Sequence, residues 1–225
     1  MNTIIDLYHQ DGFPDWEKVA GAGITGAYLK ASEGTTTWGS FVLQNADAMT
    51  KAGVKIGCYH WLRPEASIPA AAQVDAFHNV IQSVNIDPDL GVMLDIEPTL
   101  LGGSDLWLQR TPEGRASRIR AAIENLNDYG YASVVVYSPA LWWNENAYDP
   151  NLDVTLSNVR CIAARYPFND SREFSVDVFK DVAPVQMRGF AQTWGWQYSE
   201  KGQVDGFAGD CDMTVLLAGT GLLGN

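Results

Sequence analysis

Short apolar runs alternate with amphipathic stretches along almost all of the 225 residues. The runs are apolar on both faces, which is typical of strands in a parallel sheet that is covered on both sides. Eight such runs make a closed barrel the most economical arrangement. The predicted strands are residues 3–8, 24–31, 54–59, 91–96, 133–137, 160–164, 191–198 and 206–212.

The stretches between these runs are regular in the first half of the chain and irregular in the second. Residues 41–52, 68–84 and 112–129 show helical periodicity, whereas residues 138–159 and 167–190 show little. We therefore expect an α/β fold, an irregular (β/α)8 TIM-like barrel with weak or missing late helices. Without internal repeats or linkers, residues 1–225 are predicted to form a single domain.

The composition limits the partners that the protein can have. Asp and Glu number 27 against 15 Lys and Arg, and a net charge of −12 argues against nucleic acid and anionic membranes. Cys58, Cys161 and Cys211 lie in apolar runs without CxxC spacing, so we expect reduced core thiols and no bound metal. No run reaches the ~20 apolar residues of a membrane span, and the N-terminus does not resemble a signal peptide. We therefore expect synthesis in the cytoplasm without membrane insertion.

Acidic residues stand at the carboxyl ends of three predicted strands, where barrel enzymes place their active sites. Asp6 ends the first strand, Asp95 and Glu97 end the fourth, and Asp212 ends the eighth. The first and eighth strands are neighbours in a closed barrel, so Asp6 and Asp212 should lie side by side. Asp95 and Glu97 are two residues apart and should face the same side of their strand.

Two carboxylates as close as Asp95 and Glu97 cannot both ionise freely, so the pKa of one should rise. A protonated Glu97, with its longer reach, could donate to a glycosidic oxygen while an ionised Asp95 stabilises positive charge. A structural ion pair or a divalent-metal site would use the same residue types, and both alternatives stay open at this point.

Aromatic residues favour a saccharide groove among these alternatives, because sugar rings have flat apolar faces. Tryptophans fall at or just after predicted strand ends, together with other strand-end residues that we expect to line the groove. The tryptophans are Trp61, Trp107, Trp142, Trp143, Trp194 and Trp196, and the other residues are His60, Tyr137, Tyr166 and Gln197. Arg63 could meet a substrate carboxylate, although an ion pair is the simpler expectation, and Glu33 is expected to hold its loop beside Lys30.

Several motifs, taken in order, resemble glycoside hydrolase family 25, the Chalaropsis-type lysozymes of bacteria and phages. The resemblance covers nearly the whole chain, and its order and spacing are more specific than any single motif. The matching segments are Ile5-Asp6-Leu7-Tyr8-His9, Leu29-Lys30-Ala31-Ser32-Glu33-Gly34, Gly57-Cys58-Tyr59-His60-Trp61, Arg63-Pro64, Leu94-Asp95-Ile96-Glu97, Ala164-Arg165-Tyr166, Trp196-Gln197-Tyr198-Ser199 and Gly209-Asp210-Cys211-Asp212.

The resemblance implies an irregular barrel that hydrolyses the β-1,4 bond between N-acetylmuramic acid and N-acetylglucosamine in peptidoglycan, without a cofactor. It implies that Glu97 is the acid/base and Asp95 its partner, with Asp6 and Asp212 as supporting acids. Tyr59, Tyr137 and Trp196 would lie near the sugar. Asp95 could attack the anomeric carbon or orient the substrate's N-acetyl group, and the Asp-x-Glu arrangement favours the second role.

The chain departs from the family pattern at two places that concern sugar stacking. Cys161-Ile162 stands where a tryptophan is usual, and Tyr8-His9-Gln10 replaces Ser-His-Trp-Gln. We expect a monomeric phage endolysin without a separate wall-binding domain, which reaches the cell wall through a phage-made membrane lesion. The alternatives are a non-catalytic carbohydrate-binding barrel and a metal-dependent phosphoesterase.

Overall fold

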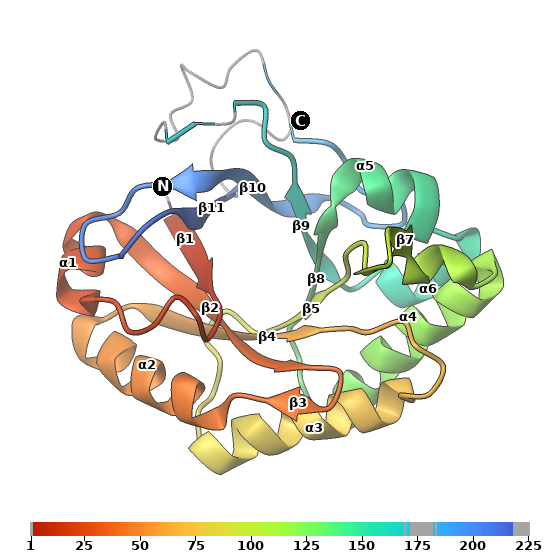
Figure 1. Cartoon of the computed structure of the whole chain (residues 1–225), viewed down its shortest axis with the longest axis horizontal. Coiled ribbons are helices and arrows are strands. Elements are labelled where there is room, and N and C mark those ends of the chain that lie inside the picture. The colour runs from red at the N-terminus through yellow and green to blue at the C-terminus, as the bar shows by residue number, and fades with distance from the viewer. Residues whose placement is uncertain (1, 169, 172–181, 183, 218–225) are drawn as a thin grey trace.

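The computed structural model describes residues 2–168, 170–171, 182 and 184–217, and eight of its strands form a closed barrel (Figure 1). Around the barrel the strands follow the order β1-β11-β10-β9-β8-β5-β4-β2, and pairing of β1 with β2 closes the ring. The strands are β1 (Asn2–Leu7), β2 (Ile24–Glu33), β4 (Lys55–Trp61), β5 (Val92–Asp95), β8 (Val134–Pro139), β9 (Arg160–Ala164), β10 (Thr193–Gly202) and β11 (Cys211–Leu216).

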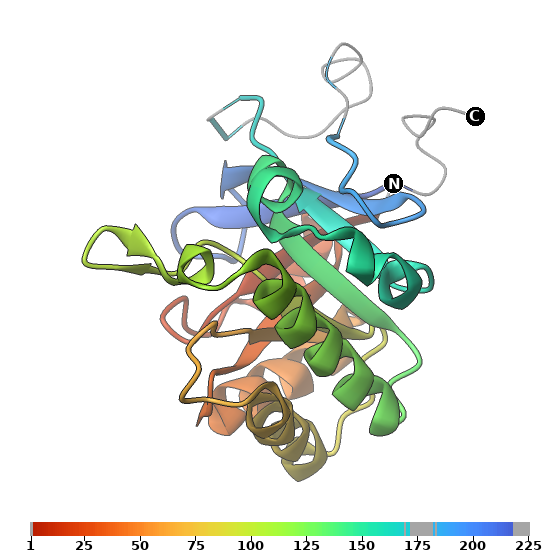
Figure 2. The same cartoon turned by 90° about the vertical axis from the view of Figure 1, so that its right-hand side faces the viewer.

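Regular helices cover the first half of the barrel and short ones follow, which confirms the irregularity predicted for residues 138–159 (Figures 1 and 2). Much of the second segment predicted to be irregular, residues 167–190, lies outside the described residues. The first group is α1 (Trp16–Gly21), α2 (Gly39–Ala52), α3 (Ala70–Val84) and α4 (Pro112–Asp128). Between β8 and β9 lie only the short turns α5 (Ala140–Trp142), η2 (Trp143–Ala147), η3 (Pro150–Leu152) and α6 (Asp153–Leu156). None of the helices in the described part of the chain is long and apolar enough to cross a membrane.

Three short strands lie outside the barrel ring. β3 (Thr36–Thr37) pairs antiparallel with the end of β2. β6 (Leu100–Leu101) and β7 (Ser104–Asp105) form a hairpin that is followed by the turn η1 (Leu106–Gln109). This hairpin projects from the body of the molecule in Figure 2. It comes directly after β5, so it rises beside the barrel end where Asp95 and Glu97 lie.

Two hydrophobic cores result from the alternation of side chains along the strands. One core fills the barrel and includes Tyr28, Met93 and Val135, and the larger one lies between the barrel and the outer helices. Gly57 is required in the inner core, because the ring of Tyr28 occupies the space where a Cβ would lie. The three cysteines are buried and free, as the sequence predicted.

The last strand corrects the expectation of a wholly parallel barrel. β11 runs antiparallel to both of its neighbours, β10 and β1. The described residues 203–210 join β10 to β11 without a helix, and so short a connection can only form a hairpin. The strand predicted at residues 206–212 is in fact this turn followed by the first residues of β11.

Candidate functional site

Four carboxylates meet in one pocket of about 270 Å³ at the barrel end that faces the viewer in Figure 1. Their strands bring them there from positions far apart in the sequence, as the strand-end pattern predicted. The pocket is lined by Asp6, Tyr8, Lys30, Tyr59, Trp61, Met93, Asp95, Glu97, Tyr137 and Asp212.

Asp6 and Asp212 face each other as register partners of β1 and β11. The expected proximity is therefore confirmed, although Asp212 lies at the start of an antiparallel strand and not at the end of a parallel one. Burial, together with the charge of Glu97, raises the pKa of Asp212 to about 6. Burial and the charge of Asp212 also raise the pKa of Asp6, and a hydrogen bond between the two carboxyls requires a shared proton.

Asp95 and Glu97 form the second acidic pair, and burial is the main cause that raises the pKa of both. The charge of Glu97 raises the pKa of Asp95 further, whereas the hydrogen bond from Asp95 and the charge of Lys30 lower that of Glu97. The two carboxyl groups are hydrogen-bonded to each other, and the pKa of Asp95 is the more strongly raised of the two. The direction of these shifts agrees with the expected rise of a pKa within the pair, and the roles of acid and ionised partner stay predictions.

The backbone after β5 fixes the direction of these two acids. The amide of Ile96 donates to the carbonyl of Tyr137 at 3.0 Å, which extends the pairing with β8 beyond Asp95. Ile96 is fully buried in the outer core, so its neighbours on either side point into the barrel mouth. The hydroxyl of Thr99 donates to the carbonyl of Glu97 at 3.3 Å.

Gln197 of β10 holds the opposite wall of the pocket. Its Oε1 accepts hydrogen bonds from the hydroxyls of Tyr137 at 2.7 Å and Tyr166 at 2.5 Å. Its Nε2 donates to Oδ2 of Asp6 at 2.9 Å. Gln197 is buried, so it positions one acid and two tyrosines from behind, whereas the sequence suggested direct contact with substrate.

Lys30 is a pocket residue that the sequence analysis did not include among the functional ones. Its Nζ lies 2.7 Å from Oε2 of Glu33, which confirms the expected pair, and 4.4 Å from the ring centroid of Trp61. Burial of this ammonium group places a fixed positive charge beside the acids. Its position at a strand end within a matching motif was the signal that could have identified it.

Two expected sugar contacts are corrected by the direction of the side chains. His60 is fully buried against α3, where it is hydrogen-bonded to Ser32 and Gln73, and burial lowers its pKa to about 3. Trp196 is also fully buried in the outer core, and its indole donates to the carbonyl of Arg165 at 2.8 Å. Period-two alternation turns their neighbours Trp61 and Gln197 inward and these two residues outward.

The other tryptophans are spread over the structure. Trp107 and Trp143 are fully buried, and the indole of Trp142 donates to Asp105 at 3.0 Å. Trp194 stacks under the guanidinium of Arg160. Among the described residues, Trp61 is the one tryptophan that lines the acidic pocket. Within the same described part, no group of three or more acidic, histidine or cysteine side chains has the arrangement of a metal site.

A closed α/β barrel with paired acids and tyrosines at one mouth is the arrangement of a glycoside hydrolase. The chain belongs to the glycosyl hydrolases family 25, whose sequence profile matches residues 5–207. This membership confirms the family resemblance and the type of barrel that it implied.

Curated relatives and solved structures agree with this assignment. The chain is 32% identical to Lysozyme M1 of Streptomyces globisporus over 213 residues, which are 92% of this chain and 65% of that protein. It is 28% identical to the autolytic lysozyme of Clostridium acetobutylicum, covering 96% of this chain and 57% of the relative. The chain therefore spans less than two thirds of the length of these two relatives.

Among solved structures, the bacterial lysozyme from Streptomyces coelicolor superposes with a TM-score of 0.76 at 26% identity, covering 96% of this chain and 91% of that one. The catalytic domain of endolysin ply40, from bacteriophage P40 of Listeria monocytogenes, shares the fold with a TM-score of 0.70 at 17% identity. It covers 96% of this chain and 93% of that domain.

Proposed function

We propose that the protein is a peptidoglycan muramidase, which hydrolyses the β-1,4 bond between N-acetylmuramic acid and N-acetylglucosamine. The observation that carries this proposal is the buried pair of acids, Asp95 and Glu97, that lines the pocket at the barrel mouth of a family 25 chain. Tyr59, Trp61 and Tyr137 supply the aromatic surface against which a sugar ring would pack.

Glu97 is proposed as the acid and base of the reaction. As the glycosidic bond breaks, its carboxyl group gives a proton to the leaving oxygen, and the hydrogen bond from Asp95 supplies that proton to Glu97. Glu97 then accepts a proton from the water that attacks the anomeric carbon. Lys30 assists the second step, because its positive charge favours the ionised form of Glu97.

Asp95 is proposed to orient the substrate's N-acetyl group and not to attack the sugar itself. Burial raises the pKa of Asp95 well above its usual range, and its Oδ1 has no hydrogen-bond partner among the described residues. Once its proton has passed to Glu97, the carboxylate of Asp95 can accept from the N–H of the acetamido group. The acetamido oxygen then forms the bond to the anomeric carbon while the glycosidic bond breaks, and water later displaces it.

The decisive experiment digests purified peptidoglycan with the wild type and with Glu97→Gln, reduces the fragments with borohydride and analyses them by mass spectrometry. We expect muramitol ends from the wild type and a loss of at least about 10³-fold in the variant, because the amide cannot donate a proton of suitable acidity. Circular dichroism checks that the variant folds.

Two other outcomes would contradict the proposal. A folded Glu97→Gln variant with normal activity would remove Glu97 from the mechanism. Binding of glycan without new reducing ends in either digest would instead identify a carbohydrate-binding barrel.

The biological setting is proposed separately as lysis of a bacterial host from within by a monomeric endolysin. The support is the chemistry of the site together with a fold shared with an endolysin catalytic domain. Expression inside bacteria should leave cells intact until a pore-forming protein opens the membrane, and light scattering should give the mass of one chain. Lysis without the pore, or a dimer mass, would contradict this setting.

A further inference from the structure

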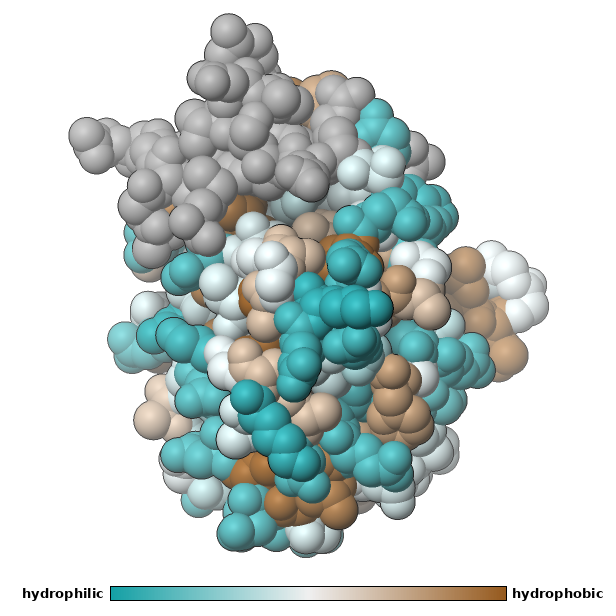
Figure 3. All heavy atoms as spheres, turned by 90° about the vertical axis from the view of Figure 1, so that its left-hand side faces the viewer, coloured by the Kyte–Doolittle hydropathy of each residue, from teal (hydrophilic) through white to brown (hydrophobic). Residues whose placement is uncertain are grey.

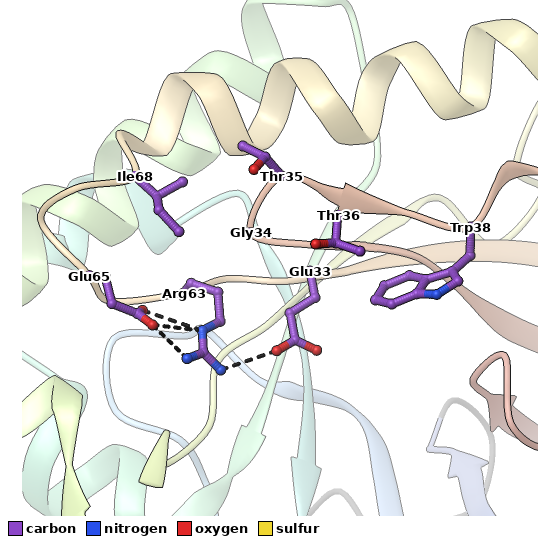
Figure 4. Close-up of a pocket in the computed structure, with 8 residues that line it drawn as sticks. All are labelled: Glu33, Gly34, Thr35, Thr36, Trp38, Arg63, Glu65 and Ile68. Carbon is purple, nitrogen blue, oxygen red and sulfur yellow. Dashed lines mark hydrogen bonds and ion pairs between the residues drawn. The ribbon is translucent and has the colours of Figure 1, made fainter. Parts of the chain in front are cut away.

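Lys30 carries the positive charge that lines the acidic pocket, yet within the described part of the chain it forms no ion pair with the acids of that pocket. Its buried Nζ instead binds Oε2 of Glu33 at 2.7 Å, and Glu33 lines a neighbouring cavity (Figure 4). The ammonium group also lies 4.4 Å from the ring centroid of Trp61 and 5.5 Å from that of Trp38. The direction of this charge therefore depends on Glu33.

Glu33 is itself fixed by a second cation. Its Oε1 accepts from the guanidinium of Arg63 at 3.1 Å, so each of its oxygens serves a different positive group. Glu65 binds the same guanidinium at 2.5 Å, and Figure 4 shows Arg63 between the two carboxylates. A carboxylate that is tied at both oxygens has little freedom to rotate, and neither has the ammonium group that it binds.

The loop that carries Arg63 is braced from the outer helices. Gln73 of α3 is buried, and its side chain accepts from the amide of Arg63 at 2.9 Å and donates to the carbonyl of the same residue at 3.0 Å. Arg118 of α4 is also buried and donates to three carbonyls of the loop at distances between 2.7 and 3.0 Å. Buried groups on two helices thus fix the loop, and the loop fixes Glu33.

The acids of the pocket are the partners that a released Lys30 would find. Its charge already reaches Asp95 and Glu97, since it lowers the pKa of both. A direct ion pair would hold the paired acid in its ionised form. If that acid were Glu97, it could no longer give a proton to a glycosidic oxygen.

We propose that Glu33 is a positioning residue, which holds the Lys30 ammonium group beside the acidic pocket and out of an ion pair with Asp95 and Glu97. The inference rests on the proposed muramidase function. At this distance the positive charge supports Glu97 when it is ionised, and it leaves Glu97 free to take up the proton that the first step needs. Arg63 acts one step further away, by fixing Glu33.

The other titratable groups around the ammonium group come from the neighbouring strands. Those inside the barrel mouth or directly behind it are Asp6, Tyr59, His60, Asp95, Tyr137 and Asp212. Tyr8 lies at the rim, and His9 stacks on a tryptophan there. Burial raises the pKa of Tyr59 and Tyr137 and lowers that of His60 to about 3, so these three are uncharged near neutral pH. The remaining groups are the same in every variant below, so a difference between variants isolates the substituted residue.

The test compares pH profiles of kcat/KM on purified peptidoglycan, whose alkaline limb reports the loss of the proton from the general acid. In Glu33→Gln we expect this limb to move down by about one pH unit, because the released Lys30 stabilises the ionised form of Glu97. Glu65→Gln is the matched control: it removes the same charge from Arg63 but does not free Lys30, so the limb should move by less than about 0.3 units. Glu33→Asp keeps the charge and should restore most of the wild-type profile.

An NMR signal from the ammonium group of Lys30 gives a second measurement, which does not depend on activity. The protein is labelled with ¹⁵N-lysine, and the signal is assigned by its loss in Lys30→Met. In the wild type its chemical shift should change little while the pocket acids titrate. In Glu33→Gln it should follow their titration, because the ammonium group then binds to them.

Three results would overturn the inference. An alkaline limb that stays in place in a folded Glu33→Gln variant would show that Glu33 does not keep Lys30 from the acids. An equal shift in Glu65→Gln would assign the effect to charge lost from the cavity, and an equal loss of kcat/KM at every pH would make Glu33 a structural residue. Absence of muramitol ends from the wild type would refute the muramidase itself, and the NMR signal would then still decide whether Glu33 holds Lys30.

Discussion

Gln197 connects the acids and tyrosines of the pocket through one amide group. Its oxygen accepts from two tyrosine hydroxyls while its nitrogen donates to Asp6, so all three groups depend on its orientation. An amide can do this at every pH, because it always offers both a donor and an acceptor. A carboxyl group in the same place can do so only while it is protonated.

In the Gln197→Glu variant, the hydrogen bond that positions Asp6 should therefore depend on pH. Below the pKa of the new carboxyl group, its O–H can donate to Asp6 and the contacts are kept. Above that pKa, its charge repels Asp6 and Asp212, so we expect the alkaline limb of the kcat/KM profile to move down by about one pH unit. An unchanged profile would show that Gln197 does not position Asp6, and Gln197→Leu should lose activity at every pH.

Asp212 should make the protein less stable at neutral pH than in mild acid. Its folded pKa of about 6 lies above its ordinary value of 3.8, so the folded state binds the proton more tightly. The stabilisation is complete below about pH 4 and is lost as the pH rises towards 6, at a cost on the order of 3 kcal/mol. Asp212→Asn should thus raise Tm at pH 7, lower activity, and change Tm little near pH 4. A Tm gain of equal size at both pH values would show that the gain does not come from the protonation of Asp212.

The sequence predicted which strand ends carry the site, but not which side chains face it. Asp95 and Glu97 were placed on one face correctly, because two charged residues on a buried strand have only the barrel mouth to point to. His60 and Trp196 were wrong, because their strands are apolar on both faces and the pattern does not distinguish inside from outside. The partners that show the direction, Gln73 and Arg165, come from other parts of the chain.

The β6–β7 hairpin is the element most directly attached to Glu97. Leu100 and Leu101, which form its first strand, are 69% and 68% exposed, so packing does little to hold the hairpin. Asp105 holds its base instead, by accepting from the amides of Thr99 and Trp107 and from the indole of Trp142. Thr99 lies in the same part of the hairpin, and its hydroxyl donates to the carbonyl of Glu97.

Asp105→Ala should loosen this base and lower both stability and activity. Loss of three hydrogen bonds to one carboxylate is expected to reduce the free energy of unfolding by about 2 kcal/mol. Hydrogen exchange should speed up in residues 97–107 first, since the acceptor that orders them is gone. Asp87→Ala, at an exposed loop position, is the control, and equal exchange in both variants would mean that Asp105 is not the anchor.

Strand order shows a second limit of prediction from sequence. The apolar runs identified seven of the eight barrel strands, because burial on both faces requires such runs, whereas the eighth prediction covered mostly the turn before β11. The direction of a strand depends on the connection that precedes it. Residues 206–210 were predicted to start a strand, although they belong to the turn between β10 and β11. The antiparallel β11 nevertheless puts Asp212 opposite Asp6, because reversing the strand brings its first residues to the same barrel mouth.

At the scale of the whole molecule, the proposed function requires an acidic protein to approach a polymer that is itself acidic. The net charge is −12, and hydrophilic residues are spread over the coloured part of the face in Figure 3, between smaller hydrophobic patches. The pocket adds to this repulsion, because its four carboxylates are accompanied by one lysine. Bacterial walls that carry anionic polymers should therefore slow the encounter of enzyme and substrate at low salt.

Salt should relieve that repulsion. Raising ionic strength from about 0.01 to 0.15 M shortens the Debye length from ~30 to ~8 Å, so the rate on intact walls should rise about three- to tenfold. Walls stripped of their anionic polymers should show a rise of less than about twofold, because glycan without these polymers repels the enzyme little. Turbidity clearing on both substrates measures the two rates. If salt accelerated both equally, the effect would not come from repulsion between the enzyme and the anionic polymers of the wall.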